Sequence, residues 1–271
     1  MSDNLLEFPG EGVDYDMPAE TYHRIKALSK STAEAAVRSP AHWWAKMRTP
    51  EDDKEKKSRR VGSALHVAVL EPGRFDSLYV AAPALNKNSN AWKDWLAENA
   101  DRKSLDPVEL DSIHGMAKAI RRDPVCMRLM SGSKTEVSMF WHDQTTGVPC
   151  KARIDIASPI ALADPKTTDD AGEATFTAQA SKMRYHCQEA HYRNGWWKLH
   201  AEDLPFFFIA VETKPPHGLK VYETHPDTLS AGREWMGRAA EAFLDVLDSG
   251  DNPRCYTPGV HQLYLPAWAS R

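Results

Sequence analysis

Residues 148–166 read VPCKARIDIASPIALADPK, and this stretch decides the fold class. Apolar and polar side chains alternate over residues 148–157, as in a β-strand that buries one face. Pro159 interrupts the alternation, and residues 160–166 form a short apolar strand that ends in charge. Because so short a turn joins the two strands, we expect them to pair antiparallel.

The strand pattern extends in both directions from this pair. Residues 135–142 (TEVSMFWH) alternate as a strand and residues 144–147 (QTTG) form a turn, which completes an antiparallel meander of three strands. Downstream, we expect a helical region over 174–199 and two further strands over 206–213 and 219–224. A long helix over 227–247 and a proline-containing tail over 250–271 follow.

The part of the chain before the meander is expected to be helical. Ser29, Ser31 and Thr32 are N-cap candidates for a helix that stops at Ser39-Pro40, and a second helix begins at Ala41. The charged run EDDKEKKSRR is a solvated loop or the start of a helix. We expect a buried helix over 61–70 and a polar connection that leads into a short helix over 82–103. One long amphipathic helix is expected over 107–130.

This order of elements predicts an α/β fold with a mixed central sheet of about five strands, flanked by helices, and a helical N-terminal part. We expect a single domain over residues 1–271. Its parts would be the helical segment 1–60, a core over 61–225, and a C-terminal helix and tail over 226–271.

The composition is that of an ordinary soluble globular protein, with 42% hydrophobic and 27% charged residues. The net charge of −4 does not by itself indicate a nucleic-acid binder, although a local groove can still be basic. The best apolar run, 204–211, is far shorter than the roughly 20 residues of a membrane span, and no secretory signal is visible. The cysteines are widely scattered, which favours reduced thiols in a cytosolic protein: Cys126, Cys150, Cys187 and Cys255.

Three charged residues at the strand ends suggest chemistry. Asp164 and Lys166 alternate along one strand and therefore share a face, and Asp155 lies near the end of the strand before it. Two carboxylates suit a hard cation such as Mg²⁺, and a nearby ammonium can orient a water or stabilise charge on a phosphate. Taken alone, an Asp-x-Lys pair is more often a pair of surface charges.

A longer series of residues resembles the RecB-type branch of the PD-(D/E)xK nucleases, and within it the phage RecE-type exonucleases. The members of the series occur in the order of that family: His66 in GSALHVAVLEP, Glu136, Asp155 in KARIDI, Asp164-Pro165-Lys166, and Gln188 and Tyr192 in QEAHY. The stretch LSKSTAEAAVRSPAHWW is similar to the helix that begins many such domains. The resemblance covers about residues 20–225 and implies a restriction-endonuclease-like core.

The resemblance implies a role for each of these residues. His66, Asp155, Asp164 and the backbone carbonyl of Pro165 would bind Mg²⁺, or Mn²⁺ in its place, and Lys166 would position the attacking water. Gln188 and Tyr192 would shape the site and contact DNA. Glu136 would make a further acidic contact or bind a second metal ion. His186 and His191 are interpreted as surface residues or as residues behind the site, and Trp196 and Trp197 as packing. No iron–sulfur cluster is expected, because Cys255 stands alone near the C-terminal end.

The resemblance also implies a function: 5′ to 3′ hydrolysis of double-stranded DNA from its ends, which leaves 3′ overhangs for a single-strand annealing protein in phage recombination. It further implies a ring-shaped homo-oligomer, a trimer or tetramer, in the cytoplasm of a bacterial host. Other readings remain open, namely an endonuclease or single-strand nuclease of the same superfamily, a catalytically inactive DNA-binding module, or an interaction protein whose Asp-x-Lys is coincidental.

Overall fold

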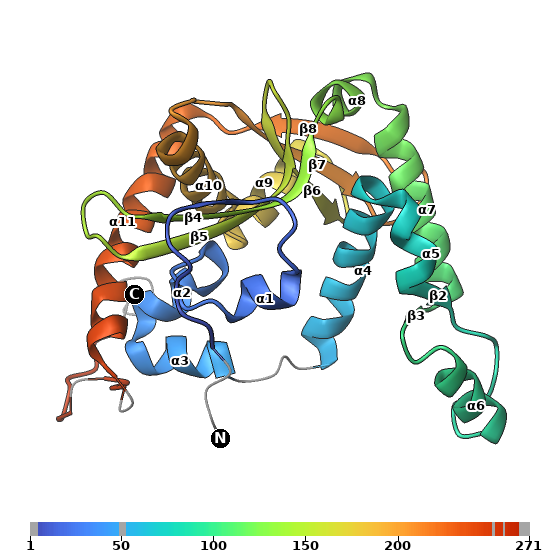
Figure 1. The fold of residues 1–271 in the computed structure, drawn as a ribbon, viewed down its shortest axis with the longest axis horizontal. Coiled ribbons are helices and arrows are strands. Elements are labelled where there is room, and N and C mark those ends of the chain that lie inside the picture. Colours follow the sequence, from blue (N-terminus) through green and yellow to red (C-terminus); the bar gives the residue numbers. More distant parts are fainter. Residues whose placement is uncertain (1–4, 49–52, 251–252, 257, 266–271) are drawn as a thin grey trace.

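A mixed six-stranded sheet forms the centre of the computed structural model (Figure 1), which describes residues 5–48, 53–250, 253–256 and 258–265, without the side chains of 53–59. The strand order is β1-β4-β5-β6-β7-β8. The strands are β1 (Gly12–Asp14), β4 (Lys134–His142), β5 (Pro149–Ala157), β6 (Leu162–Thr168), β7 (Phe206–Glu212) and β8 (Leu219–Glu223). The predicted fold class is confirmed, and β1 is a sixth strand that the sequence pattern did not indicate.

Pairing within the sheet follows the lengths of the connections. β4, β5 and β6 form the predicted antiparallel meander, and β7 and β8 are also antiparallel. β6 and β7 are parallel, because two helices, α9 (Glu173–Lys182) and α10 (Tyr185–His200), connect them. The helical region predicted over 174–199 is thus present as two helices, because Arg184 takes a left-handed conformation, with φ of 52°, and separates them.

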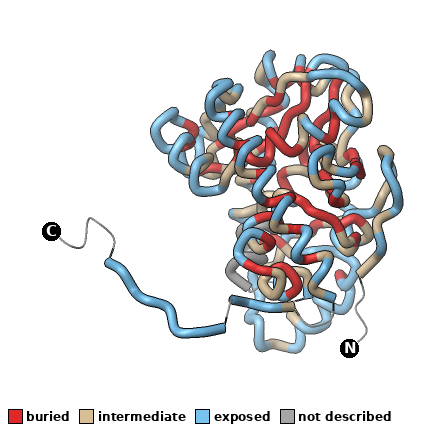
Figure 2. Tube along the Cα trace, turned by 90° about the vertical axis from the view of Figure 1, so that its left-hand side faces the viewer, coloured by how far each residue is buried: buried red, intermediate tan, exposed pale blue. Residues whose placement is uncertain are grey.

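Helices cover both faces of the sheet, which gives three layers (Figure 1). One hydrophobic cluster joins the strands to α2 (Lys30–Arg38), α3 (Pro40–Arg48), α10 and α11 (Pro226–Asp248). The other joins them to α4 (Asp53–Leu70), α5 (Phe75–Leu78), α7 (Pro107–Arg122) and α8 (Pro124–Met130). α1 (Ala19–Arg24) packs beside β4. Figure 2 shows the buried residues gathered along the strands and on the inner sides of these helices.

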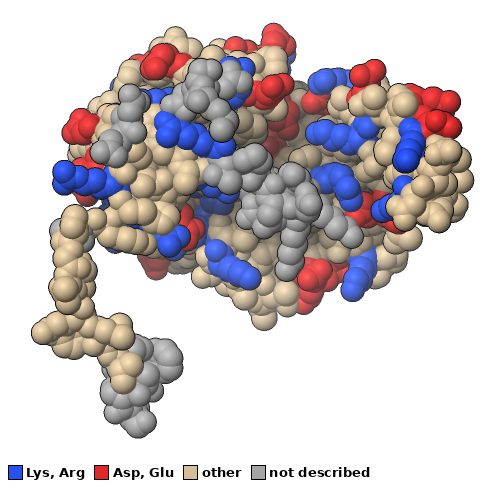
Figure 3. All heavy atoms as spheres, turned by 90° about the horizontal axis from the view of Figure 1, so that it is seen from below, with Lys and Arg blue, Asp and Glu red and all other residues tan. Residues whose placement is uncertain are grey.

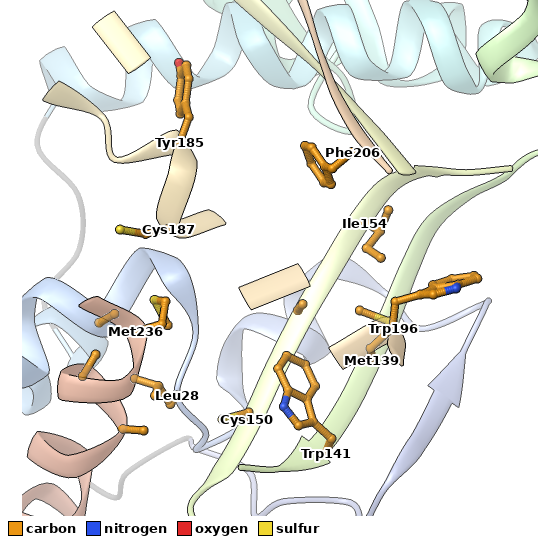
Figure 4. Close-up of a cluster of buried hydrophobic side chains, with 14 of the residues drawn as sticks. Leu28, Met139, Trp141, Cys150, Ile154, Tyr185, Cys187, Trp196, Phe206 and Met236 are labelled. Atoms are coloured by element: carbon orange, nitrogen blue, oxygen red, sulfur yellow. The ribbon is translucent and has the colours of Figure 1, made fainter. Parts of the chain in front are cut away.

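The larger cluster is built around Trp141 of β4 (Figure 4). The Trp141 side chain is fully buried between the sheet and α10. A Cβ atom at Gly195 of α10 would lie 2.6 Å from the Trp141 ring, so the helix can approach this strand only because residue 195 has no side chain. α10 therefore lies directly against β4 and β5, a position that brings its first turns toward the ends of the strands.

Several predicted helix boundaries are confirmed and others need correction. Ser29 caps α2, as expected, and α3 begins at Pro40. The single helix expected over 107–130 is two helices, because Pro124 cannot continue α7 and the Asp123 side chain caps α8. The charged run before Arg60 is largely the start of α4, and residues 51 and 52 lie outside the described chain.

A small appendage lies between α5 and α7. It contains the short helix α6 (Asn90–Glu98) and two short parallel strands, β2 (Tyr79–Ala81) and β3 (Lys103–Leu105), that were not predicted. A 3₁₀ turn, η1 (Pro72–Arg74), precedes α5. Among the helices that the structure describes, none is long and apolar enough to cross a lipid bilayer.

Candidate metal centre

The site forms where β5 and β6 separate. The two strands pair at Ala157↔Leu162 and Ile156↔Ala163, and Asp155 and Asp164 are the residues next to the last of these pairs. Pro165 follows immediately, at a point where β6 pairs only with β7 among the described strands. Since proline has no N–H to donate, it is tolerated where the ladder to β5 has ended. The two aspartates therefore face a gap between neighbouring strands.

α4 closes the gap from one side and supplies His66. The His66 Nδ1 atom lies 3.4 Å from Asp155 Oδ2, and Nε2 lies 3.0 Å from the carbonyl oxygen of Pro165. One ligand atom from each of His66, Asp155 and Asp164 lies within 4.8 Å of the other two. The structure thus brings together all four groups that were predicted to bind a metal.

The donor set fits a divalent cation. Asp155 Oδ2 and Asp164 Oδ1 are both buried and have no hydrogen-bond partner among the described residues. A buried carboxylate oxygen without a partner is costly, and coordination to a hard cation satisfies it. His66 Nε2 and the carbonyl oxygen of Pro165 lie 3.0 Å apart, so both atoms would be available to the same cation. A bound cation would supply Lewis acidity and lower the pKa of a coordinated water.

The two aspartates respond differently to burial. Burial, together with the charge of Asp164, raises the pKa of Asp155 well above its ordinary value. Burial also acts to raise the pKa of Asp164, but the Lys166 ammonium and His66 outweigh it and hold that pKa below the ordinary value. These opposite shifts favour the anionic form of Asp164 and the neutral form of Asp155.

Lys166 and Gln188 both bind the same oxygen of Asp164. Lys166 Nζ lies 2.7 Å from Asp164 Oδ2, and Gln188 Nε2 donates to that oxygen as well. These contacts leave Asp164 Oδ1 free to face the gap between the strands. Burial lowers the pKa of Lys166, but the charges of Asp164 and Asp155 outweigh burial and raise it, so this side chain is cationic in the metal-free site.

Glu136 and Tyr192, the other two predicted site residues, lie beside this group. Glu136 has a left-handed backbone, with φ of 55°, and its carboxylate accepts a hydrogen bond of 2.6 Å from Arg153 Nε. Its side chain is thus engaged by an arginine and is not part of the three-residue group. Tyr192 packs its ring against Phe206, with centroids 6.0 Å apart, and burial raises its pKa. DNA contact by Tyr192 stays a prediction.

Two residues near the site were not predicted. The ring of Tyr185 lies under Lys166 Nζ at 5.1 Å, and Lys30 Nζ of α2 lies 5.8 Å from the same ring. Burial, followed by the charge of Lys166, lowers the pKa of Lys30 to about 8. Lys30 belongs to the stretch that opens the N-terminal helix, but no spacing rule relates it to Lys166, because the fold alone brings them together.

The histidine and tryptophan predictions have mixed outcomes. His191 is buried, and its Nε2 lies 3.1 Å from the backbone oxygen of Lys151, so the surface alternative does not apply to it and the alternative of a residue behind the site stays a prediction. His186 is partly exposed. Trp196 is buried and stacks on His200, as expected for packing, whereas Trp197 is 47% exposed.

A mixed sheet with an acidic pair and a lysine at the ends of adjacent strands defines a domain of the PD-(D/E)xK type. The chain belongs to the family of PDDEXK-like domains of unknown function (DUF3799), whose model matches residues 24–256. No curated protein matches the sequence.

A solved structure shares the fold. A protein from Eubacterium rectale, whose crystal structure is described as that of a "putative exonuclease", superimposes with a TM-score of 0.62 at 17% identity, over 94% of this chain and 98% of that chain. The structure of SSO0001 covers 83% of this chain and 88% of that chain at 12% identity, with a TM-score of only 0.31.

Proposed function

We propose that this protein is a divalent-metal-dependent exonuclease that hydrolyses double-stranded DNA from its ends. The observation that carries the proposal is the pair of unpartnered, buried carboxylate oxygens of Asp155 and Asp164, which lie beside His66 and Lys166. Family membership supports the nuclease class, and the description of the structural neighbour from Eubacterium rectale agrees with an exonuclease.

Each residue of the site has a chemical task in phosphodiester hydrolysis. Asp155, Asp164, His66 and the Pro165 carbonyl would hold Mg²⁺, or Mn²⁺ in its place. Lys166 would orient the attacking water and stabilise charge that develops on the phosphate. Gln188 would hold Asp164 in the orientation that directs Oδ1 toward the cation, a contribution typical of groups behind metal ligands.

Polarity and biological role come from the resemblance to RecE-type exonucleases. We propose 5′ to 3′ degradation that leaves 3′ overhangs for a single-strand annealing protein in phage recombination, in the cytoplasm of a bacterial host. We also propose a ring-shaped homo-oligomer around the DNA. A ring confines its substrate mechanically, which suits a chain with a net charge of −4.

Digestion of linear duplex DNA tests the proposal. Duplexes labelled at the 5′ end or at the 3′ end are incubated with Mg²⁺ or with EDTA, beside a closed circular duplex and the Lys166→Ala protein. The expected result is early release of the 5′ label in Mg²⁺, with the circle intact and the variant inactive.

Other outcomes identify the alternatives. Cleavage of the circle would show an endonuclease, and early release of the 3′ label would reverse the polarity. Absence of cleavage with either Mg²⁺ or Mn²⁺ would contradict the enzymatic proposal and favour a DNA-binding module with an inactive site.

A further inference from the structure

Lys30 of α2 is a second lysine beside the candidate metal centre, and the proposed hydrolysis does not use it. Its Nζ atom lies 5.8 Å from the centroid of the Tyr185 ring, and Lys166 Nζ lies 5.1 Å from the same centroid. The negative face of an aromatic ring attracts cations, so Tyr185 draws together two ammonium groups from elements far apart in the sequence. Two like charges this close repel each other unless an anion lies beside them.

The Tyr185 ring is a fixed support for both lysines. It is 6% exposed, and Phe208 of β7 stacks on it with centroids 5.2 Å apart. Gln179 Nε2 donates to its hydroxyl oxygen at 3.1 Å. The Lys30 side chain is also held in place, because its Nζ donates to the carbonyl oxygen of Met183 at 2.7 Å. The fold therefore sets the position of Lys30 relative to Lys166.

The two lysines differ in how their charge is compensated. Lys166 Nζ lies 2.7 Å from Asp164 Oδ2, which neutralises it. Among the residues that the structure describes, no carboxylate forms an ion pair with Lys30, and Glu34, one helical turn further on, lies 3.8 Å from Arg184 Nε instead. Burial, followed by the charge of Lys166, lowers the pKa of Lys30 to about 8. An ammonium has three N–H donors and a backbone carbonyl uses one, so Lys30 keeps two donors and an uncompensated charge.

We propose that Lys30 is a positioning residue that binds the phosphate next to the one at the metal centre, on the same DNA strand. Lys166 contacts both Asp164 and the Tyr185 ring, whereas Lys30 contacts the ring but not the aspartate, so Lys30 is the farther of the two from the metal ligands. A phosphate that the metal and Lys166 hold therefore leaves Lys30 available to a neighbouring phosphate, which is a common partner of lysine. The inference rests on the proposed function for the identity of the anion. DNA binding can be measured without cleavage, so the two can fail separately.

The salt dependence of DNA binding tests this contact. Fluorescence anisotropy of a labelled linear duplex with the full chain, in Ca²⁺, gives the association constant over a range of KCl concentrations. Each lost phosphate contact reduces the slope of log affinity against log salt by about 0.9 for duplex DNA, or about 0.7 for a single strand, and Lys30→Ala should show a reduction of that size. Lys30→Arg should restore most of the slope. A purely structural role would weaken binding at every salt concentration and leave the slope unchanged.

Lys26→Ala is the matched control. Lys26 lies just before α2, is partly exposed as Lys30 is, and places its Nζ 5.0 Å from the centroid of another aromatic ring, that of Trp44. Among the described residues, Lys26 forms no contact with the metal centre. Its replacement should leave the salt slope at the wild-type value.

Duplexes with one uncharged methylphosphonate linkage identify the phosphate that Lys30 binds. The linkage is moved one step at a time from the end of each strand. At one position the wild type should lose about tenfold in affinity, and Lys30→Ala should lose nothing further there because the contact is already absent. An unchanged salt slope for Lys30→Ala, equal losses for wild type and Lys30→Ala at every linkage, or no DNA binding by the wild type would overturn the proposal.

Discussion

Asp155 and Asp164 face the same gap between strands, yet their surroundings shift their pKa values in opposite directions. Lys166 and Gln188 bind one oxygen of Asp164 and keep that residue ionised. Asp155 has no comparable cation, and burial raises its pKa. A metal that enters this site would therefore compete with protons for Asp155.

Proton release on metal binding is the first prediction at the scale of residues. Isothermal titration of the protein with MnCl₂, in two buffers of different ionisation enthalpy, should show heats that depend on the buffer, and affinity should rise with pH. Asp155→Asn should abolish the buffer dependence because it removes the titrating group. Heats that are identical in both buffers for the wild type would contradict the assigned protonation.

The second residue prediction concerns Gln188. Gln188→Leu removes the hydrogen bond to Asp164 without adding charge, and we expect it to lower the rate of DNA cleavage by about 10- to 100-fold, as is typical for partners of metal ligands. Gln144→Leu, in the exposed turn between β4 and β5, is the control and should keep the wild-type rate. An unchanged rate for Gln188→Leu would remove this residue from the site.

Much of the site could be predicted from residue types and their order. Asp155, Asp164 and Lys166 follow a strand pattern whose alternation places them on a common face. Lys30 and the engagement of Glu136 by Arg153 could not be predicted, because they depend on distances between segments far apart in the chain. Sequence periodicity carries no information about such distances.

At the scale of elements, the crossing of α10 and α11 sets the position of Gln188. A Cβ atom at Gly232 would lie 2.3 Å from the backbone oxygen of His186, whereas one at Gly237 on the same helix would meet nothing within 4 Å. Both substitutions by alanine gain about 1 kcal/mol of helix propensity, so their difference isolates the contact between the helices.

Chemical denaturation of the two alanine variants measures that difference. Gly232→Ala should lower the free energy of unfolding by about 1–3 kcal/mol, because backbone atoms must move apart. Gly237→Ala should match or slightly exceed the wild type. Equal stability of the two variants would show that the helices do not cross this closely.

A second prediction for these elements concerns His191, which joins α10 to β5. Burial lowers its pKa to about 4, so the folded protein keeps it neutral while the unfolded chain binds a proton near pH 6.5. This residue should therefore remove about 3 kcal/mol of stability as the pH falls from 6.5 to 4.

Urea unfolding across this pH range measures whether the free energy of unfolding falls as the pH falls. His191→Gln should flatten the loss of stability at low pH, and the control His225→Gln, at a side chain that is 72% exposed, should retain it. The same change of stability with pH in wild type and in His191→Gln would contradict the lowered pKa assigned to His191.

The elements themselves were mostly predictable, since alternation marks β4 to β8 and apolar periodicity marks α4, α7 and α11. The breaks inside helices were not. Pro124 ends α7 and Arg184 takes a left-handed conformation between α9 and α10, but the hydrophobic pattern continues across both residues. Local periodicity extends through a break whenever both helices bury the same side.

At the scale of the whole molecule, tertiary contacts decide what local patterns leave open. β1 has three residues and pairs with β4 across most of the N-terminal half of the chain, so no short pattern identifies it. Likewise, Figure 3 shows several Lys and Arg side chains, interspersed with Asp and Glu, on the face that it draws, in a chain with a net charge of −4. The distribution of charge over each face is therefore a property of the fold, and total charge does not predict it.

The most direct test of the account pairs metal binding with cleavage in one set of proteins. Single-turnover hydrolysis of a linear duplex in Mg²⁺, and Mn²⁺ binding in parallel, would be measured for wild type, Asp164→Asn, Lys166→Ala and the exposed control Lys198→Ala. We expect Asp164→Asn to lose both metal binding and cleavage. Lys166→Ala should bind metal but cleave at least about 100-fold more slowly, and Lys198→Ala should match wild type. Cleavage in EDTA, or full activity of Asp164→Asn or Lys166→Ala, would contradict it.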